Sequence, residues 1–336
     1  MGINWRLAVC AGLLALLGAA GADDQAARSS VEKPFVVAGV ARTGSPWFVR
    51  HSKGFIKGAT DYGMQSIYTL PESVDPEEQL RVIDKYILQG VDALLVIPNN
   101  AHKLEAIFKK AQEKGIAVIT GSSQDQINAD FDIELIDNSA FGALMMDEMM
   151  RFVGDKSGTY AIFTTTDSSE SATQNIIATA AIMRQRSAYR QLKFVGKYSV
   201  SDDRTMAKRK ALELLDAHPD LRGILCLGSE GSPGVAAALR ERGLRTDQFA
   251  LLGMATPNVV RKLIKDGYMA EILLYDPALA AHIQTYIARM LLDGRRNEIR
   301  QGFEIPGIGK PEIQGNNIIF NIPLIISADN IDEFRF

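Results

Sequence analysis

Short apolar runs alternate with amphipathic segments along nearly the whole chain after residue 33, and this alternation limits the folds that the chain can adopt. Runs such as Val36–Ala41 and Ala93–Ile97 have the length and composition of strands buried on both faces. Between them lie segments such as Pro76–Gln89, which places Leu80 and Ile87 on one helical face. Strands separated by helices in this way predict parallel sheets with right-handed crossovers.

Ten predicted strands suit two lobes of about five strands each better than one large sheet. The composition shifts near Asp137-Asn138, which places the first crossover between the lobes there. After Gly294 helix signals are few, so the tail is expected to wrap the body in extended segments. The predicted strands are Val36–Ala41, Gln65–Thr69, Ala93–Ile97, Ala117–Thr120, Ile133–Ile136, Tyr160–Thr164, Phe194–Val200, Gly223–Leu227, Ala250–Gly253 and Ala270–Tyr275.

The first 22 residues have the pattern of an export signal. One positive charge precedes the apolar run Leu7–Leu17, and the small residues Ala20-Gly21-Ala22 form a cleavage site. A buried N-terminal helix is the alternative, but the charge placement favours export. We therefore expect a signal peptide over 1–22, a linker over 23–33 and a soluble periplasmic product. Cleavage leaves Cys226 as the sole cysteine, in a predicted strand, so a packed thiol is expected and no disulfide.

Several classes of function are disfavoured by what the sequence lacks. A net charge of −3 without a concentrated basic run argues against nucleic-acid binding. The Gly39-x4-Gly44-Ser45 spacing lacks the lysine of a phosphate loop, and there is no G-x-S-x-G nucleophile elbow. None of the four histidines is spaced as a zinc ligand, and His51 and His102 are predicted on helix surfaces. The sequence therefore implies no catalytic residue, metal or cofactor.

Polar loops follow several predicted strands at their carboxyl ends, where open α/β sheets bind ligands. Their hydroxyl and amide groups, with few charges, suit a neutral polyhydroxyl ligand. Helix capping is the alternative for such residue types, and it is preferred for Ser123, Ser171 and Ser232. Capping explains Arg42, Gln174 and Asp276 less well. The loops are Arg42-Thr43, Asn99-Asn100, Gly121–Gln124, Thr164–Gln174, Gly228–Glu230 and Tyr275-Asp276.

The first of these loops also carries two aromatic residues at a helix start. Ser45 is a candidate N-cap and Pro46 suits the first helical turn. Phe48 is in phase with Phe55, so it is expected to face the core. Trp47 is out of phase and therefore freer to stack on a sugar, whose C–H groups suit an aromatic face.

These residues resemble a known family. The ribose-binding type of periplasmic sugar-binding protein, a type I periplasmic binding protein, has a first βα unit that is similar to Ser45-Pro46-Trp47-Phe48-Val49. Its lobe-crossing segment is similar to Asp137-Asn138-Ser139-Ala140-Phe141-Gly142. Gly253–Val259, Tyr275-Asp276 and the ending Ile326–Phe336 resemble its autoinducer-2 and rhamnose-binding branch.

The resemblance implies an α/β fold of two Rossmann-like lobes with parallel sheets, joined by a three-segment hinge that closes on one ligand without catalysis. The lobes would comprise 34–136 plus 276–320 and 137–275 plus 321–336. Ser122 and Thr173 stand where the autoinducer-2 receptors have aspartates, so a different sugar or sugar-like polyol is expected. The ligand residues that the resemblance implies are Arg42, Trp47, Phe48, Ser122, Thr173, Gln174, Leu227, Ser229 and Asp276.

The same resemblance implies a partner for the closed form. The leading hypothesis is an ABC permease in the inner membrane. A sensor that presents its ligand to a membrane histidine kinase or chemoreceptor is the alternative. An exported hydrolase is disfavoured because no nucleophile with a base is visible. A transcription regulator shares the body plan but would carry a DNA-binding segment where this chain has an export signal. A monomer is the default expectation.

Overall fold

The structure is a computed structural model that describes residues 33–165 and 172–336. The predicted signal peptide, most of the predicted linker and the middle of the Thr164–Gln174 loop lie outside these residues. The described strands fall into two sheets, called sheet A and sheet B below.

The first strand and helix are formed as their residues predict. Strand β1 is Val36–Val40, and helix α1 is Pro46–Asp61. Ser45 occupies the N-cap position and Pro46 the first turn, although the Ser45 hydroxyl makes no capping hydrogen bond. The fixed φ of proline therefore starts the helix here without help from a capping side chain.

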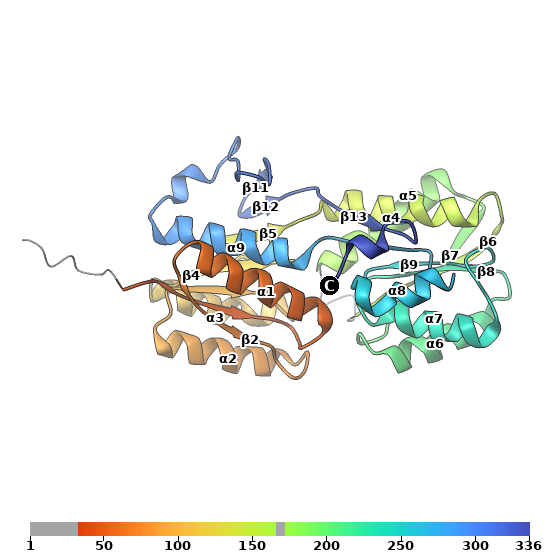
Figure 1. Ribbon diagram of the computed structural model, residues 1–336, viewed down its shortest axis with the longest axis horizontal. Coiled ribbons are helices and arrows are strands. Elements are labelled where there is room, and N and C mark those ends of the chain that lie inside the picture. The colour runs from red at the N-terminus through yellow and green to blue at the C-terminus, as the bar shows by residue number, and fades with distance from the viewer. Residues whose placement is uncertain (1–32, 166–171) are drawn as a thin grey trace, which may run out of the picture. The chain divides into compact units, whose positions relative to one another are not determined.

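Sheet A has the strand order β11-β12-β5-β4-β3-β1-β2. Successive strand residues point to opposite faces, so Leu95 joins the core under α1 and α9, whereas Leu94 joins the core under α2 and α3 (Figure 1). The other elements of this sheet are β2 (Gln65–Thr69), α2 (Pro76–Gln89), β3 (Ala93–Val96), α3 (Ala101–Glu113), β4 (Ala117–Gly121), β5 (Phe131–Glu134), α9 (Pro277–Leu292), β11 (Glu312–Gln314) and β12 (Asn317–Ile319).

Sheet B has the order β13-β10-β9-β8-β6-β7. Its face that carries Leu225 packs on methionines of α4, and the face that carries Cys226 packs under α6 to α8. The elements are α4 (Asn138–Val153), β6 (Gly158–Thr164), α5 (Ala172–Ala188), β7 (Leu192–Ser199), α6 (Arg204–Ala217), β8 (Leu221–Cys226), α7 (Gly231–Arg242), β9 (Ala250–Gly253), α8 (Pro257–Lys265), β10 (Glu271–Leu274) and β13 (Leu324–Ile326).

The two sheets repeat one doubly wound strand order. In sheet A it runs β2-β1-β3-β4-β5, and in sheet B β7-β6-β8-β9-β10. The chain passes between the sheets at 135–137, 275–276 and 320–323. This is the predicted α/β fold of two Rossmann-like lobes joined by three segments. In such sheets ligands bind beyond the carboxyl ends of the strands, next to the point where the strand order reverses.

One connection differs from the prediction that helices separate the strands. Residues 122–130, between β4 and β5, form a loop without a helix. The Glu105 carboxylate from α3 accepts hydrogen bonds from the backbone N–H groups of Ile127 (2.7 Å) and Asn128 (2.8 Å). The Asp130 carboxylate accepts from Val118 N–H at 2.8 Å. The Glu105 carboxylate thus satisfies loop N–H groups that a helix would otherwise pair, and the Asp130 carboxylate satisfies an N–H group of β4.

The tail is more regular than the extended wrapping that the sequence predicts. Strands β11 and β12 form a hairpin, and β12 continues sheet A parallel to β5. Strand β13 then pairs antiparallel with β10 in sheet B. The tail therefore supplies strands to both sheets, because each sheet offers it an edge with unpaired backbone groups.

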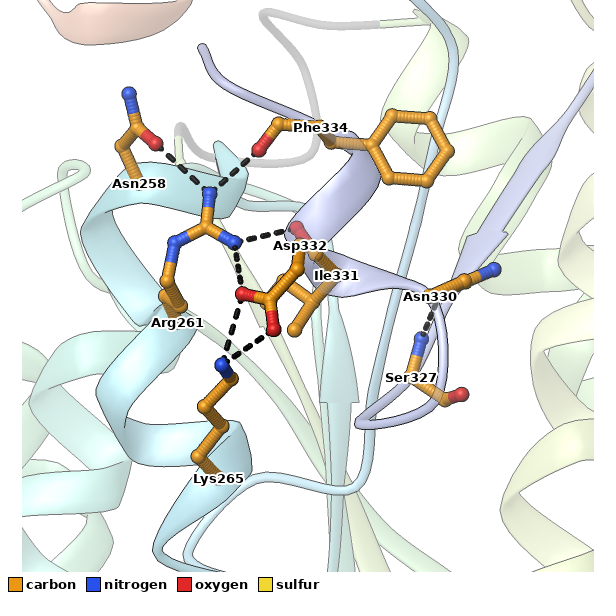
Figure 2. Close-up of polar contacts among 8 residues, drawn as sticks. All are labelled: Asn258, Arg261, Lys265, Ser327, Asn330, Ile331, Asp332 and Phe334. Atoms are coloured by element: carbon orange, nitrogen blue, oxygen red, sulfur yellow. Dashed lines mark hydrogen bonds and ion pairs between the residues drawn. The ribbon is translucent and has the colours of Figure 1, made fainter.

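The last ten residues are fixed to helix α8. Figure 2 shows Arg261 donating to the Asp332 carboxylate (3.0 Å) and to the backbone carbonyl of Phe334, while Lys265 reaches Asp332 at 2.6 Å. These hydrogen bonds hold the pKa of Asp332 below its ordinary value, with Lys265 the larger cause. The terminal residue Phe336 accepts a backbone hydrogen bond from Asn258 at 2.8 Å.

Candidate functional site

A cavity of about 230 Å³ opens at the carboxyl ends of strands from both sheets. A single water needs only ~10–15 Å³, so the cavity has room for a small molecule. Its lining combines aromatic and aliphatic side chains with a few polar ones. The lining residues are Arg42, Thr43, Trp47, Phe48, Val74, Pro76, Ile97, Asn99, Lys103, Ser122, Ile136, Asn138, Thr165, Thr173, Gln174, Ile177, Asp202, Leu227, Gly228, Ser229, Met254 and Tyr275.

Eight of the nine residues that the sequence analysis selected line this cavity, and Asp276 does not. The Asp276 carboxylate instead accepts hydrogen bonds from Arg50 Nε (3.0 Å) and Nη2 (2.8 Å) and from Ala278 N–H (2.9 Å), which caps α9. The guanidinium of Arg50 also lies over the ring of Phe336, 4.5 Å from its centroid.

Trp47 is more buried than Phe48, the reverse of the order that helical phase suggests, and both side chains pack on the same core. Trp47 is buried and Phe48 only partly buried, although both line the cavity. The indole meets Phe48 edge-on at 4.8 Å and Tyr275 edge-on at 5.8 Å between centroids. Tyr275 comes from the second segment between the sheets, so the residue that covers Trp47 lies far from α1 in the sequence. Helical phase alone could not reveal this cover.

His51 is buried behind Trp47, which corrects the prediction that it lies on a helix surface. Its ring stacks on the indole at 5.6 Å and 22°, and its Nδ1 lies 2.8 Å from the Tyr68 hydroxyl. Burial lowers the pKa of His51 to about 3, so the ring is neutral at neutral pH. The neutral imidazole of His51 thus stacks on the Trp47 indole and supports it at the cavity.

Arg42 brings a cation to the sheet A side of the cavity. Its Nε donates to the Pro98 carbonyl at 2.7 Å and its Nη2 to the Ser122 carbonyl at 3.4 Å. Among the described residues no carboxylate lies within ion-pair distance of it, and burial lowers its pKa. Part of the guanidinium therefore stays available to an acceptor in the cavity.

Ser122 connects the two sheets at the cavity wall. Its backbone has a φ of +54°, its hydroxyl lies 2.7 Å from the Tyr275 hydroxyl, and its carbonyl accepts from Thr173 Oγ1 at 3.0 Å. Gln174, next to Thr173, donates to the Leu227 carbonyl at 3.2 Å and so braces the end of β8.

Several buried polar atoms at the cavity have no hydrogen-bond partner among the described residues. They are the Asn99 amide nitrogen, both ends of the Asn138 amide and the Trp47 indole nitrogen. Burying such groups without a partner costs about 1–3 kcal/mol each. A ligand that hydrogen-bonds to them would remove this cost.

Two carboxylates deep in sheet A were missed from the sequence. Asp132 accepts from Thr120 Oγ1 at 2.7 Å, and burial raises its pKa to about 6. Burial and the neighbouring Asp132 raise the pKa of Glu134 well above its ordinary value. In their ionised form both carboxylates raise the pKa of Arg42 against the effect of burial. Glu134 lies in the predicted strand Ile133–Ile136 and Asp132 directly before it, where nothing marks an acidic residue as buried.

Asn138 and Asp202 are cavity residues that the sequence analysis did not select. Asn138 is the first residue of α4, at the predicted crossover, and Asp202 follows β7. Asn138 is the fourth residue after β5 and Asp202 the third after β7, so both lie near strand ends, which is the signal that identified the other polar loops. In the described part of the chain no group of three or more potential metal ligands is found, and no helix has the length and apolar character needed to cross a bilayer.

The repeated doubly wound order, the three connecting segments and the cavity lined from both sheets define a type I periplasmic binding protein fold. The chain belongs to the periplasmic binding protein family, whose domain pattern matches residues 36–296.

Relatives of the chain agree with this assignment. The ribose import binding protein of Bacillus subtilis is 25% identical over 275 residues, which cover 80% of this chain and 85% of that protein. LsrB from Clostridium saccharobutylicum, solved in complex with AI-2, superposes with a TM-score of 0.80 at 21% identity over 90% of this chain and all of that one. An ABC transporter solute binding protein from Clostridium phytofermentas with bound L-rhamnose gives 0.81 at 21% identity over 90% and 98%.

Proposed function

We propose that this protein is the periplasmic solute-binding component of an ABC transporter, that it binds a small neutral sugar or sugar-like polyol, and that it releases the ligand unaltered. The observation that carries the proposal is the set of buried, unpartnered polar atoms of Asn99, Asn138 and Trp47 around one cavity. Hydroxyl groups both donate and accept, so a polyol can satisfy an amide, an indole N–H and a guanidinium together.

The cavity lining carries charges of both signs, which suits a neutral ligand with both donors and acceptors. Arg42 and Lys103 bring cations from the sheet A side, and Asp202 brings a carboxylate from the sheet B side. Trp47 and Phe48 offer the apolar faces that sugar C–H groups pack against. The relatives named above are described with ribose, AI-2 and L-rhamnose, which agrees with a small oxygen-rich ligand.

Binding is proposed to work by hinge closure. The lobes 34–136 plus 276–320 and 137–275 plus 321–336 would turn about the three connecting segments, and only the closed form would let both contact the ligand. The ligand would then select the form that an inner-membrane permease recognises. In this scheme the ligand residues are Arg42, Trp47, Phe48, Ser122, Thr173, Gln174, Leu227 and Ser229, with Asp276 at the second hinge segment.

A thermal-shift screen with pentoses, deoxyhexoses, polyols and autoinducer-2 tests the proposal, because a ligand that binds the folded state raises the melting temperature. Calorimetry on the strongest hit should show that Trp47→Ala weakens binding at least about tenfold, or ~1.4 kcal/mol. Val49→Ala, on the exposed side of the same helix, is the matched control. Equal affinity of the Trp47 variant and its control would reject this cavity as the binding site.

A further inference from the structure

Asp202 stands out among the cavity residues by its backbone. In the described part of the chain, non-glycine residues with positive φ occur only at Ser122 (+54°), Ser201 (+50°) and Asp202 (+49°). Ser122 and Asp202 both line the cavity. Residues held in this region are strained, and such strain gathers at functional sites because the surrounding structure must impose it.

The Asp202 carboxylate is held in one orientation. Its Oδ1 accepts a hydrogen bond from the Glu230 N–H at 2.8 Å, just before α7. Gly228 packs against the same oxygen, since a Cβ at that position would lie 2.6 Å from Oδ1 and 2.2 Å from the Thr165 methyl group. The loop after β8 therefore leaves room for this carboxylate and little else.

No cation forms an ion pair with this carboxylate among the described residues. The nearby Arg204 is paired with Glu230. Burial raises the pKa of Asp202 to about 6. The backbone hydrogen bonds from Glu230 and Ser229 and the charge of Arg42 act against this rise, and the charge of Glu230 adds to it. Above that pH the ionised carboxylate destabilises the fold. Capping of α7 does not explain why residue 202 is an aspartate, because a neutral asparagine caps a helix equally well.

We infer that Asp202 is a specificity-determining residue of the cavity, whose carboxylate accepts hydrogen bonds from adjacent free hydroxyl groups of the ligand on the sheet B side. A carboxylate accepts only, so it rewards hydroxyl donors and repels an acidic group placed there. This inference rests on the proposed function, and it narrows the ligand class to neutral sugars with a vicinal diol at that end.

The test compares Asp202→Asn with Asp203→Asn in the full chain. Asp203 is the exposed neighbour that caps α6 through Met206 N–H (2.7 Å) and does not line the cavity. Binding of L-rhamnose, D-arabinose and D-ribose is measured by calorimetry at pH 7.5. Melting temperatures of the ligand-free proteins are measured at pH 7.5 and pH 5.

For each sugar that binds the wild type, Asp202→Asn should lose affinity about tenfold or more, as expected for a hydrogen bond to a charged group, and Asp203→Asn should stay within about twofold. The ligand-free Asp202→Asn protein should melt at or above the wild-type temperature at pH 7.5, with a smaller difference at pH 5, where the wild-type carboxyl is protonated.

Two results would overturn the inference. The first is an affinity of Asp202→Asn within about twofold of wild type. The second is a ligand-free melting temperature at pH 7.5 that falls by more than ~3 °C, which would show a structural role instead. If none of the three sugars binds the wild type, the proposed sugar function loses its support. The ligand-free melting temperatures then decide the role of Asp202 by themselves.

Discussion

The contact between Arg50 and Asp276 joins helix α1 to the second segment between the sheets, and its strength can be predicted from the structure. The two residues are 226 positions apart in the sequence. Asp276 also caps α9, and Arg50 also lies over the ring of the terminal residue Phe336. Asp276→Ala removes the pair and the cap, Asp276→Asn removes the charge but keeps a capping oxygen, and Arg50→Met removes the pair and the ring contact.

The magnitudes follow from exposure. The two side chains are 31% and 27% exposed, so the pair is screened and contributes about 0.5–1 kcal/mol despite its two-pronged geometry. The cap contributes about 1 kcal/mol. The contact of Arg50 with the Phe336 ring adds about 0.5 kcal/mol. Unfolding free energies should therefore fall by about 2 kcal/mol for Asp276→Ala, about 1 for Asp276→Asn and about 1–1.5 for Arg50→Met.

Urea unfolding followed by far-ultraviolet circular dichroism measures these values, and the double mutant Arg50→Met/Asp276→Asn closes a thermodynamic cycle. The expected coupling is about 0.5–1 kcal/mol. A coupling below about 0.3 kcal/mol, the usual error of additivity, would refute the contact. Equal costs for the alanine and asparagine variants of Asp276 would refute the contribution of the cap.

Two further perturbations probe the core around the cavity. Gly54→Ala should destabilise the protein by about 2 kcal/mol in urea unfolding, because the new Cβ would lie 2.0 Å from the Ala278 carbonyl oxygen and the cost of this steric overlap exceeds the gain of ~1 kcal/mol in helix propensity. Gly44→Ala is the control, because a Cβ at Gly44 meets open space. Equal stability of the two variants would contradict the close packing of α1 on α9. Burial holds the pKa of His51 at about 3, so as the pH falls below 6.5 the unfolded chain takes up a proton that the folded protein does not. Between pH 7 and pH 5 His51 should therefore remove about 2 kcal/mol of stability, and His51→Phe should lack this loss. An identical pH slope for the variant and the wild type would show that His51 is not buried in solution.

Local patterns in the sequence were enough for the strands, the helices and part of the cavity lining. The predicted helix Pro76–Gln89 is α2 to the residue, and each predicted strand overlaps an observed one. The reason is that strands buried on two faces and amphipathic helices are both recognised from the pattern of apolar residues close together in the sequence. Arg42 and Trp47 were found because polar and aromatic residues directly after a buried strand meet at the ligand edge of the sheet.

Only the tertiary structure decided which residues cover one another. Trp47 is buried because Tyr275 closes over it, and His51 lies inward because it stacks on that indole. Asp276 forms an ion pair with Arg50, and the tail strands β12 and β13 pair with sheet A and sheet B. Asp202 reaches the cavity because Ser201 and Asp202 both adopt a left-handed backbone conformation, which the amino-acid composition does not predict. These contacts join positions far apart in the chain, and local periodicity carries no information about which distant surfaces will meet.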